Sequence, residues 1–106
     1  MIDLKKIKTD TGAHILVHAD ENGKVIDSIN PEYIEYDANI ALMTETAFSM
    51  CNDLLSGITS SNLKQLIARS TENYFIANKL DSNSIIIIVS NEITKIGLLL
   101  KYMNSI

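Results

Sequence analysis

Several residue types that particular classes of protein require are scarce in this sequence. Among its 106 residues there is one cysteine, Cys51, and one arginine, Arg69. A single cysteine excludes an internal disulfide framework and every cysteine-rich zinc pattern, so a reducing cytoplasm is the compartment we expect. The longest uninterrupted apolar run, residues 85–89, is far shorter than the ~18 residues typical of a membrane span. Residues 1–8 lack the apolar region of a signal peptide, and we therefore expect neither export nor membrane insertion.

Positive charge is also scarce. Lysine and arginine together number 9, while aspartate and glutamate number 13, which gives a formal net charge of −4. Such a chain lacks the basic surface that condenses on a phosphate backbone, so nucleic acid is not an expected partner. The length leaves room for one globular domain with a single modest core. Because so small a domain hides its apolar surface with difficulty, an uncovered apolar face would favour a partner protein.

The few glycines are scattered, and none lies within six residues of another. This distribution excludes a glycine-rich phosphate loop and a nucleophile elbow, and no Ser/His/Asp arrangement is evident. We therefore expect no catalytic residue and no bound cofactor. The glycines are Gly12, Gly23, Gly57 and Gly97.

The two histidines, His14 and His18, do not suggest a metal site. On a strand their even spacing places them on one face but ~13 Å apart, too far for both to bind one metal ion. Ordinary packed histidines are therefore favoured over ligands or a general base, and no metal is expected. Cys51 falls in the apolar stripe of a predicted helix, away from the helix N-terminus, which favours a buried structural cysteine over a nucleophile.

Alternating and continuous apolar segments predict five strands. Residues 13–19 and 25–29 flank an acidic turn at 20–23 and read as a hairpin. Residues 63–70 mix charged and apolar side chains as an edge strand does. The last two strands are predicted at 74–80 and 84–90. Because the aliphatic run 85–89 has no polar break, it requires an apolar cover on both faces of the sheet and belongs at its centre.

Helical periodicity predicts the helices that cover the two faces of the sheet. A short helical segment is expected at residues 2–8, a helical turn at 30–33 where Asn30 precedes Pro31, and a final helix at 92–104. The last of these carries a stripe of Ile93, Ile96, Leu100 and Met103.

The longest predicted helix, residues 39–56, ends at Gly57 and has more apolar surface than one sheet face can cover. Its stripe extends over roughly half the circumference at ~100° per residue. Two readings of its methionines stay open, core packing and an adaptable protein interface. The main stripe is Ile40, Met43, Ala47, Met50, Cys51 and Leu54, extended on one side by Ala41, Phe48 and Leu55.

Two segments resemble the roadblock, or dynein light chain 7, superfamily. Residues 12–26 are similar to its opening of a glycine, a strand, an acidic turn with glycine, and a second strand. Residues 84–100 are similar to its last strand and the following helix with a glycine in the second turn. The likeness extends over residues 12–103, the core of a single domain that we assign to residues 1–106. The N-terminal segment is shorter than the helix with which members commonly begin.

The resemblance implies a mixed α/β (α+β) fold in which a five-stranded antiparallel sheet has the order 2-1-5-4-3. The long middle helix would cover one face, and the C-terminal helix with the short N-terminal turn would cover the other. It also implies a dimer, with itself or a paralogue, in which edge strands pair and middle helices pack side by side. The implied interface comprises Ile40, Met43, Ala47, Met50, Cys51, Leu54, Leu66, Ala68 and Arg69.

The function implied by the resemblance is non-enzymatic binding and regulation of a Ras-like small GTPase. Arg69 could then act on the nucleotide in trans as an arginine finger, although a solvated charge on an edge strand is favoured. One alternative is an assembly scaffold whose binding does not depend on nucleotide. A less favoured alternative is a small-molecule sensor, for which the sequence shows no candidate pocket.

Overall fold

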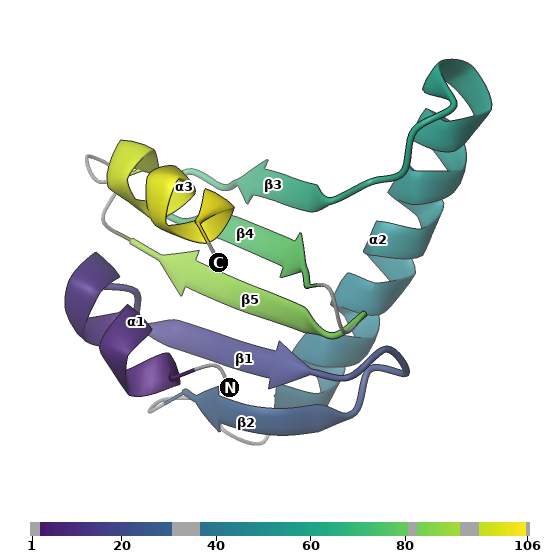
Figure 1. Cartoon of the computed structure of the whole chain (residues 1–106). Helices are drawn as coiled ribbons and strands as arrows, with labels where there is room; N and C mark the ends of the chain where they lie inside the picture. The colour runs from purple at the N-terminus through teal and green to yellow at the C-terminus, as the bar shows by residue number, and fades with distance from the viewer. Residues whose placement is uncertain (1–2, 31–36, 81–82, 92–95, 106) are drawn as a thin grey trace.

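The computed structural model describes residues 3–30, 37–80, 83–91 and 96–105. Figure 1 shows one antiparallel sheet between two layers of helices. No helix in these ranges has both the length and the hydrophobicity needed to cross a bilayer. In chain order the elements are α1 (Leu4–Thr11), β1 (Ile15–Ala19), β2 (Val25–Ile29), α2 (Asp37–Thr59), β3 (Gln65–Arg69), β4 (Tyr74–Lys79), β5 (Ile85–Ser90) and α3 (Ile96–Asn104).

The five strands lie in the order β2-β1-β5-β4-β3, as the resemblance implied. β5 occupies the centre and pairs antiparallel with both β1 and β4. Its residues 85–88 are buried, which confirms that the aliphatic run needs a cover on each face. β3, predicted from the sequence as an edge strand, forms one border of the sheet, and β2 forms the other.

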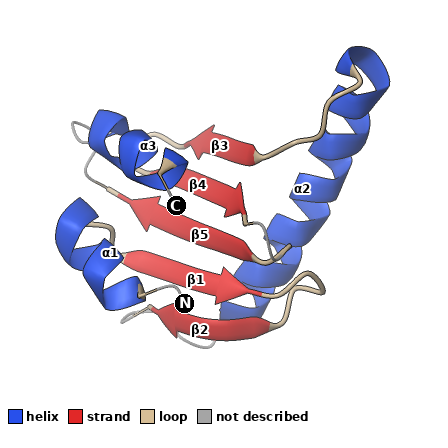
Figure 2. Ribbon diagram, in the orientation of Figure 1, coloured by secondary structure: helices blue, strands red, loops and turns tan. Residues whose placement is uncertain are grey.

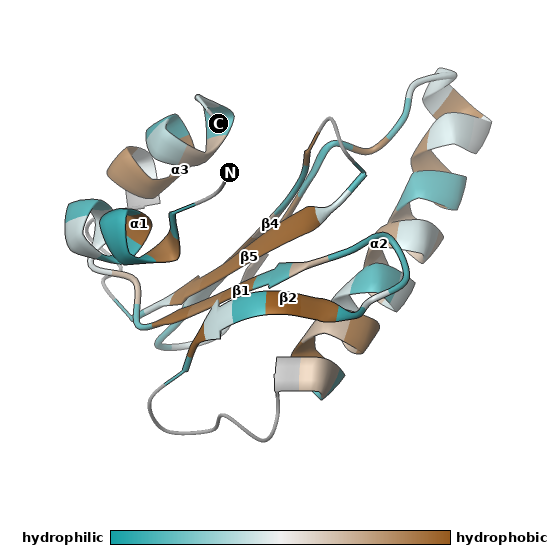
Figure 3. Cartoon of the chain, turned by 60° about the horizontal axis from the view of Figure 1, so that its bottom comes forward, coloured by the Kyte–Doolittle hydropathy of each residue, from teal (hydrophilic) through white to brown (hydrophobic). Residues whose placement is uncertain are grey.

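Each face of the sheet has its own apolar core. On one face, α1 and α3 contribute Leu4, Ile7, Leu99 and Met103, which pack against side chains that include Ile88 of β5. The face that α2 covers has a second core. Figure 2 shows the three-layer arrangement, and Figure 3 shows the hydrophobic strands lying between the helical layers. The members of the second core are Val17, Ala19, Ala41, Phe48, Ala77, Ile85 and Ile87.

The N-terminal helix is longer than the sequence indicated. Helix α1 continues to Thr11, where the expectation ended it at Lys8. The Asp3 side chain accepts a hydrogen bond from the backbone N–H of Lys6 and caps the start. Gly12 ends the helix in a left-handed conformation at φ 74°, a conformation that glycine adopts without steric penalty. The longer helix is stable because Leu4 and Ile7 are buried against the sheet and α3.

The prediction that Gly57 ends the middle helix is wrong. Helix α2 runs through Gly57 to Thr59, and Ser60 follows at φ 60°. The N–H of Ser60 donates to the carbonyl of Ser56 at 3.2 Å, so Ser60 adopts the terminating conformation that glycine was expected to supply. An exposed glycine inside a helix lowers its stability by only about 1 kcal/mol, which the rest of α2 tolerates.

The remaining boundaries agree with the sequence to within one or two residues. The turn predicted at residues 30–33 falls mostly outside the described residues, as do residues 92–95, so neither part of those predictions is tested. The described part of the last helix, α3, begins at Ile96.

Candidate interaction surface

Helix α2 exposes a continuous apolar stripe to solvent. Met43, Met50, Leu54 and Ile58 are 70%, 69%, 65% and 72% exposed. Ala47, half-buried, lies between them at the spacing that places all five on one side of a helix. Scattered exposed hydrophobic residues are ordinary, but a contiguous row along about four helical turns is the kind of surface that a partner covers. We call these five residues the α2 stripe.

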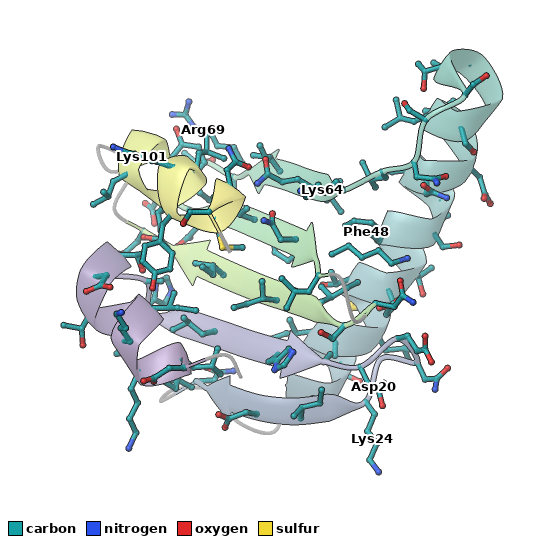
Figure 4. The ribbon with its side chains drawn as sticks, in the orientation of Figure 1. Asp20, Lys24, Phe48, Lys64, Arg69 and Lys101 are labelled. Atoms are coloured by element: carbon teal, nitrogen blue, oxygen red, sulfur yellow. The ribbon has the colours of Figure 1, made fainter. Side chains whose placement is uncertain are left out.

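A different side of the same helix packs on the sheet. Ala41, Thr44 and Phe48 are buried there, and Phe48 lies between α2 and the sheet in Figure 4. The Nζ atom of Lys79 lies 6.0 Å from the centre of the Phe48 ring. The helix therefore has two apolar sides, of which its own chain covers one.

Two predicted interface residues, Ile40 and Cys51, lie between the side of α2 that faces the sheet and the α2 stripe. Ile40 is half-buried and packs against the core that α2 shares with the sheet. Cys51 is a free cysteine of intermediate exposure, so the expectation of a buried structural cysteine is wrong. It lies at the border because the positions that face the sheet and those in the α2 stripe are adjacent around the helix.

The border strand β3 brings the other predicted interface residues to the open edge of the sheet. Leu66 is half-buried against the α2-side core, whereas Ala68 and Arg69 are exposed. The Arg69 guanidinium lies 5.4 Å from the centre of the Tyr74 ring, on the neighbouring strand. Figure 4 shows Arg69 at this margin of the molecule.

The C-terminal part of α2 and the β3 edge lie at the same border of the sheet. The C-terminal part of α2 projects past β3 and the chain then turns back into that strand (Figure 1). The backbone N–H of Leu63 donates to the Asn52 side-chain oxygen at 2.7 Å and fixes the returning segment to the helix. A partner could therefore contact the projecting helix and the edge strand at once.

The sequence interpretation missed two exposed residues of this surface. Ile58 continues the α2 stripe four positions after Leu54, but the early helix end assigned to Gly57 excluded it. Ile67 lies in the middle of β3 and is 48% exposed. Its position on an edge strand was the available signal, since alternation places it on the face opposite Leu66.

The histidines do not form a site. The Nε2 atom of His18 lies 3.1 Å from the Ser84 hydroxyl, in a half-buried setting. Burial lowers the pKa of His18 below its usual 6.5, against an opposing effect of the Asp27 carboxylate. Within the described ranges, no three histidine, cysteine, aspartate or glutamate side chains lie close enough together to hold a metal ion.

Among the residues that the structure describes, Glu45 is a second titratable group whose surroundings shift its pKa. Burial raises the pKa of Glu45 above its usual 4.5, although Lys79 opposes the shift and the acidic residues Asp20 and Glu21 add to it. Its Oε1 atom is buried without a hydrogen-bond partner among the described residues. Glu45 lies beside Gly23 of the β1–β2 turn, so this arrangement belongs to the packing of α2 against the hairpin.

No protein-family model and no curated protein matches the sequence. Solved structures do match. The structure of MglB from Myxococcus xanthus aligns over 94% of this chain and 81% of its own, with a TM-score of 0.84 and 15% sequence identity. A roadblock/LC7 domain from Streptomyces avermitilis aligns over 88% of this chain and 83% of its own, with a TM-score of 0.66 and 11% identity. The chain has the roadblock fold.

Other structures with the roadblock fold give the same result. The gliding protein MglB from Thermus thermophilus aligns over 94% of this chain and 78% of its own, with a TM-score of 0.79 and 13% identity. An MglB structure described as a tetrameric arrangement aligns with a TM-score of 0.78 and 12% identity. At 11–15% sequence identity, the likeness concerns the fold alone.

Proposed function

We propose that the chain acts in the cytoplasm as a dimer that binds and regulates a Ras-like small GTPase, without catalytic groups of its own. The observation that carries this proposal is the exposed α2 stripe together with the open β3 edge, on a fold shared with MglB and a roadblock domain. The partner class comes from the resemblance of residues 12–26 and 84–100 to the roadblock superfamily.

The dimer follows from the cost of leaving the α2 stripe in water. Full burial of a methionine, leucine or isoleucine side chain contributes roughly 1.5–3 kcal/mol, and four such side chains in the stripe are about two-thirds exposed. Two copies of the stripe packed together would hide both from water. Part of that gain offsets the entropy lost on association, which makes micromolar or tighter pairing reasonable for a contact that also includes β3.

Regulation by such a dimer would rest on differential binding. A rigid surface that fits one switch conformation of a GTPase better than the other shifts the equilibrium between them in proportion to the difference in affinity. No side chain of this chain needs to take part in hydrolysis. Arg69 is the one candidate for direct action on the phosphates, because an arginine finger stabilises charge in the transition state.

The test measures binding of the chain to Ras-like small GTPases, each loaded with GDP or with a non-hydrolysable GTP analogue. We expect at least about a fivefold difference in affinity between the two forms. Equal affinities would favour the nucleotide-independent scaffold, and no binding to either form would contradict the proposal. Any stimulated hydrolysis should be unchanged in an Arg69→Ala variant that remains dimeric by mass, whereas its loss in that dimer would identify an arginine finger.

A further inference from the structure

The hydrogen bonds of β3 show which of its backbone groups are available to a partner. The N–H of Lys79 donates to the carbonyl of Lys64, and the N–H of Ser70 donates to the carbonyl of Asn73, both at 2.9 Å. Residues 64 and 70 therefore direct their backbone groups toward β4. In an antiparallel ladder this direction alternates along the strand. The N–H and C=O groups of Gln65, Ile67 and Arg69 consequently point to the open edge.

A second copy of the same strand can pair there in few ways. If two copies are related by a two-fold axis and continue one sheet with matching faces, one residue of β3 must lie on the axis opposite itself. With Ile67 on the axis, all three outward residues find partners within the strand, for about six backbone hydrogen bonds. With Leu66 or Ala68 on the axis, one of the three outward residues is left opposite a residue outside β3.

The side chains favour the same register. With Ile67 on the axis, Ile67 meets Ile67 of the partner subunit, and Arg69 lies opposite the uncharged Gln65 of the partner subunit. The side-chain nitrogen of Gln65 donates to Asn78 at 2.8 Å and to Asn104 at 3.2 Å, which leaves its Oε1 atom as an acceptor. Arg69 has donors only, so the two side chains are complementary across the seam.

We propose that Ile67 lies on the two-fold axis of a homodimer of this chain and that Arg69 of each subunit is paired with the partner's Gln65. The inference rests on the dimer of the proposed function but assigns its register, its self-pairing and a role for Arg69. Arg69 is then a specificity residue of the dimer, because its donors face an acceptor in a second copy. A paralogue with a basic residue at the position of Gln65 would be rejected, because like charges directly opposite one another destabilise a sheet.

Disulfide cross-linking of single-cysteine variants reads the register directly. Cys51→Ala removes the native thiol, and Leu66→Cys, Ile67→Cys and Ala68→Cys are then made one at a time and oxidised mildly. Opposed residues of a hydrogen-bonded pair have Cα atoms ~5.5 Å apart, within the reach of a disulfide. A residue one position off the axis lies ~8 Å from its own copy and cannot be bridged without backbone movement.

We expect Ile67→Cys to form a covalent dimer at least about tenfold faster than the other two variants. Faster cross-linking of Leu66→Cys or Ala68→Cys would overturn the register. A dimer by mass in which none of the three variants cross-links would overturn the pairing of β3. A monomer by mass would instead refute the dimer of the proposed function, and binding of the GTPase is measured separately from all three outcomes.

A charge pair gives a second measurement that does not depend on oxidation. Gln65→Lys places a cation opposite the partner's Arg69, twice in each dimer, and should weaken dimerisation about fivefold. Adding Arg69→Glu to the same chain should restore the affinity, because the new cation then faces the partner's acid. Within one subunit the two positions are ~13 Å apart along the strand, so rescue reports contact across the seam. Absence of rescue would contradict the assigned pair.

Discussion

Phe48 and Met50 are two positions apart on α2 and have opposite environments: Phe48 is 4% exposed and packs on the sheet, while Met50 is 69% exposed. The helix is long and apolar on both sides, but one chain supplies only one sheet for it to cover. The side that holds Met50 is therefore the part of the molecule most in need of a partner.

Met50→Glu should dissociate the dimer. An unpaired charge in an apolar contact costs about 3 kcal/mol or more, which corresponds to roughly a hundredfold weaker association. Leu42→Glu is the matched control, because Leu42 is also exposed on α2, at 58%, but lies outside the α2 stripe. Size-exclusion chromatography at several concentrations should show a monomer for Met50→Glu alone. Equal elution of Met50→Glu and the parent would mean that the contact lies elsewhere.

Glu45→Gln should stabilise the protein at neutral pH. Burial raises the pKa of Glu45, so the folded state binds its proton more tightly than the unfolded state. The bound proton makes its full contribution to the free energy of unfolding below about pH 4.5. That contribution is lost as pH rises through the raised pKa. The gain at pH 7 should be roughly 0.5 kcal/mol or less, since the carboxyl is partly solvated, and it should vanish near pH 4.

Denaturant unfolding of Glu45→Gln and the parent at pH 4 and pH 7 checks this. Asp53→Asn, which removes a carboxylate at an exposed position of the same helix, serves as the control for the loss of one negative charge. A variant less stable than the parent at pH 7 would show that the charged form of Glu45 is favourable in the fold.

Protonation of His18 should lower the free energy of unfolding in mild acid. Burial lowers the pKa of His18, so the unfolded chain binds its proton more readily than the folded chain does. The corresponding stability is complete above about pH 6.5 and decreases as pH falls toward the lowered pKa. The effect should be roughly 0.5 kcal/mol or less, because the ring is half in solvent. His18→Gln should remove this part of the pH dependence, and an unchanged pH dependence in that variant would contradict the assignment to His18.

Much of the architecture could be predicted from the sequence because single features required it. Residues 85–89 had to be central, since five consecutive aliphatic side chains point to both faces of a sheet, and β5 is central and buried. The surplus of apolar surface on the middle helix could likewise be predicted from periodicity alone. The order of the other strands came from the resemblance to roadblock domains, because alternation within a strand does not say which neighbour it pairs with.

The sequence could not show which apolar residues of α2 the sheet covers and which stay exposed. About half of the circumference of α2 is apolar, and only the position of the sheet decides that Ala41 and Phe48 are covered while Met43 and Met50 are not. The predicted helix end at Gly57 was wrong for a related reason. Glycine is typical of a helix end, but the helix ends at Ser60 because of the local hydrogen bonding there. The same error removed Ile58 from the predicted interface. The direction of the outward groups of β3 likewise depends on its pairing with β4.

The mass of the protein in solution tests the central claim most directly. Light scattering coupled to size-exclusion chromatography at micromolar concentration should give twice the chain mass of 11.8 kDa. Burial of the α2 stripe by a second copy predicts this mass at concentrations above the dissociation constant of the dimer and a return to the monomer mass only below it. A mass of 11.8 kDa throughout the concentration range, with the protein folded, would contradict the account.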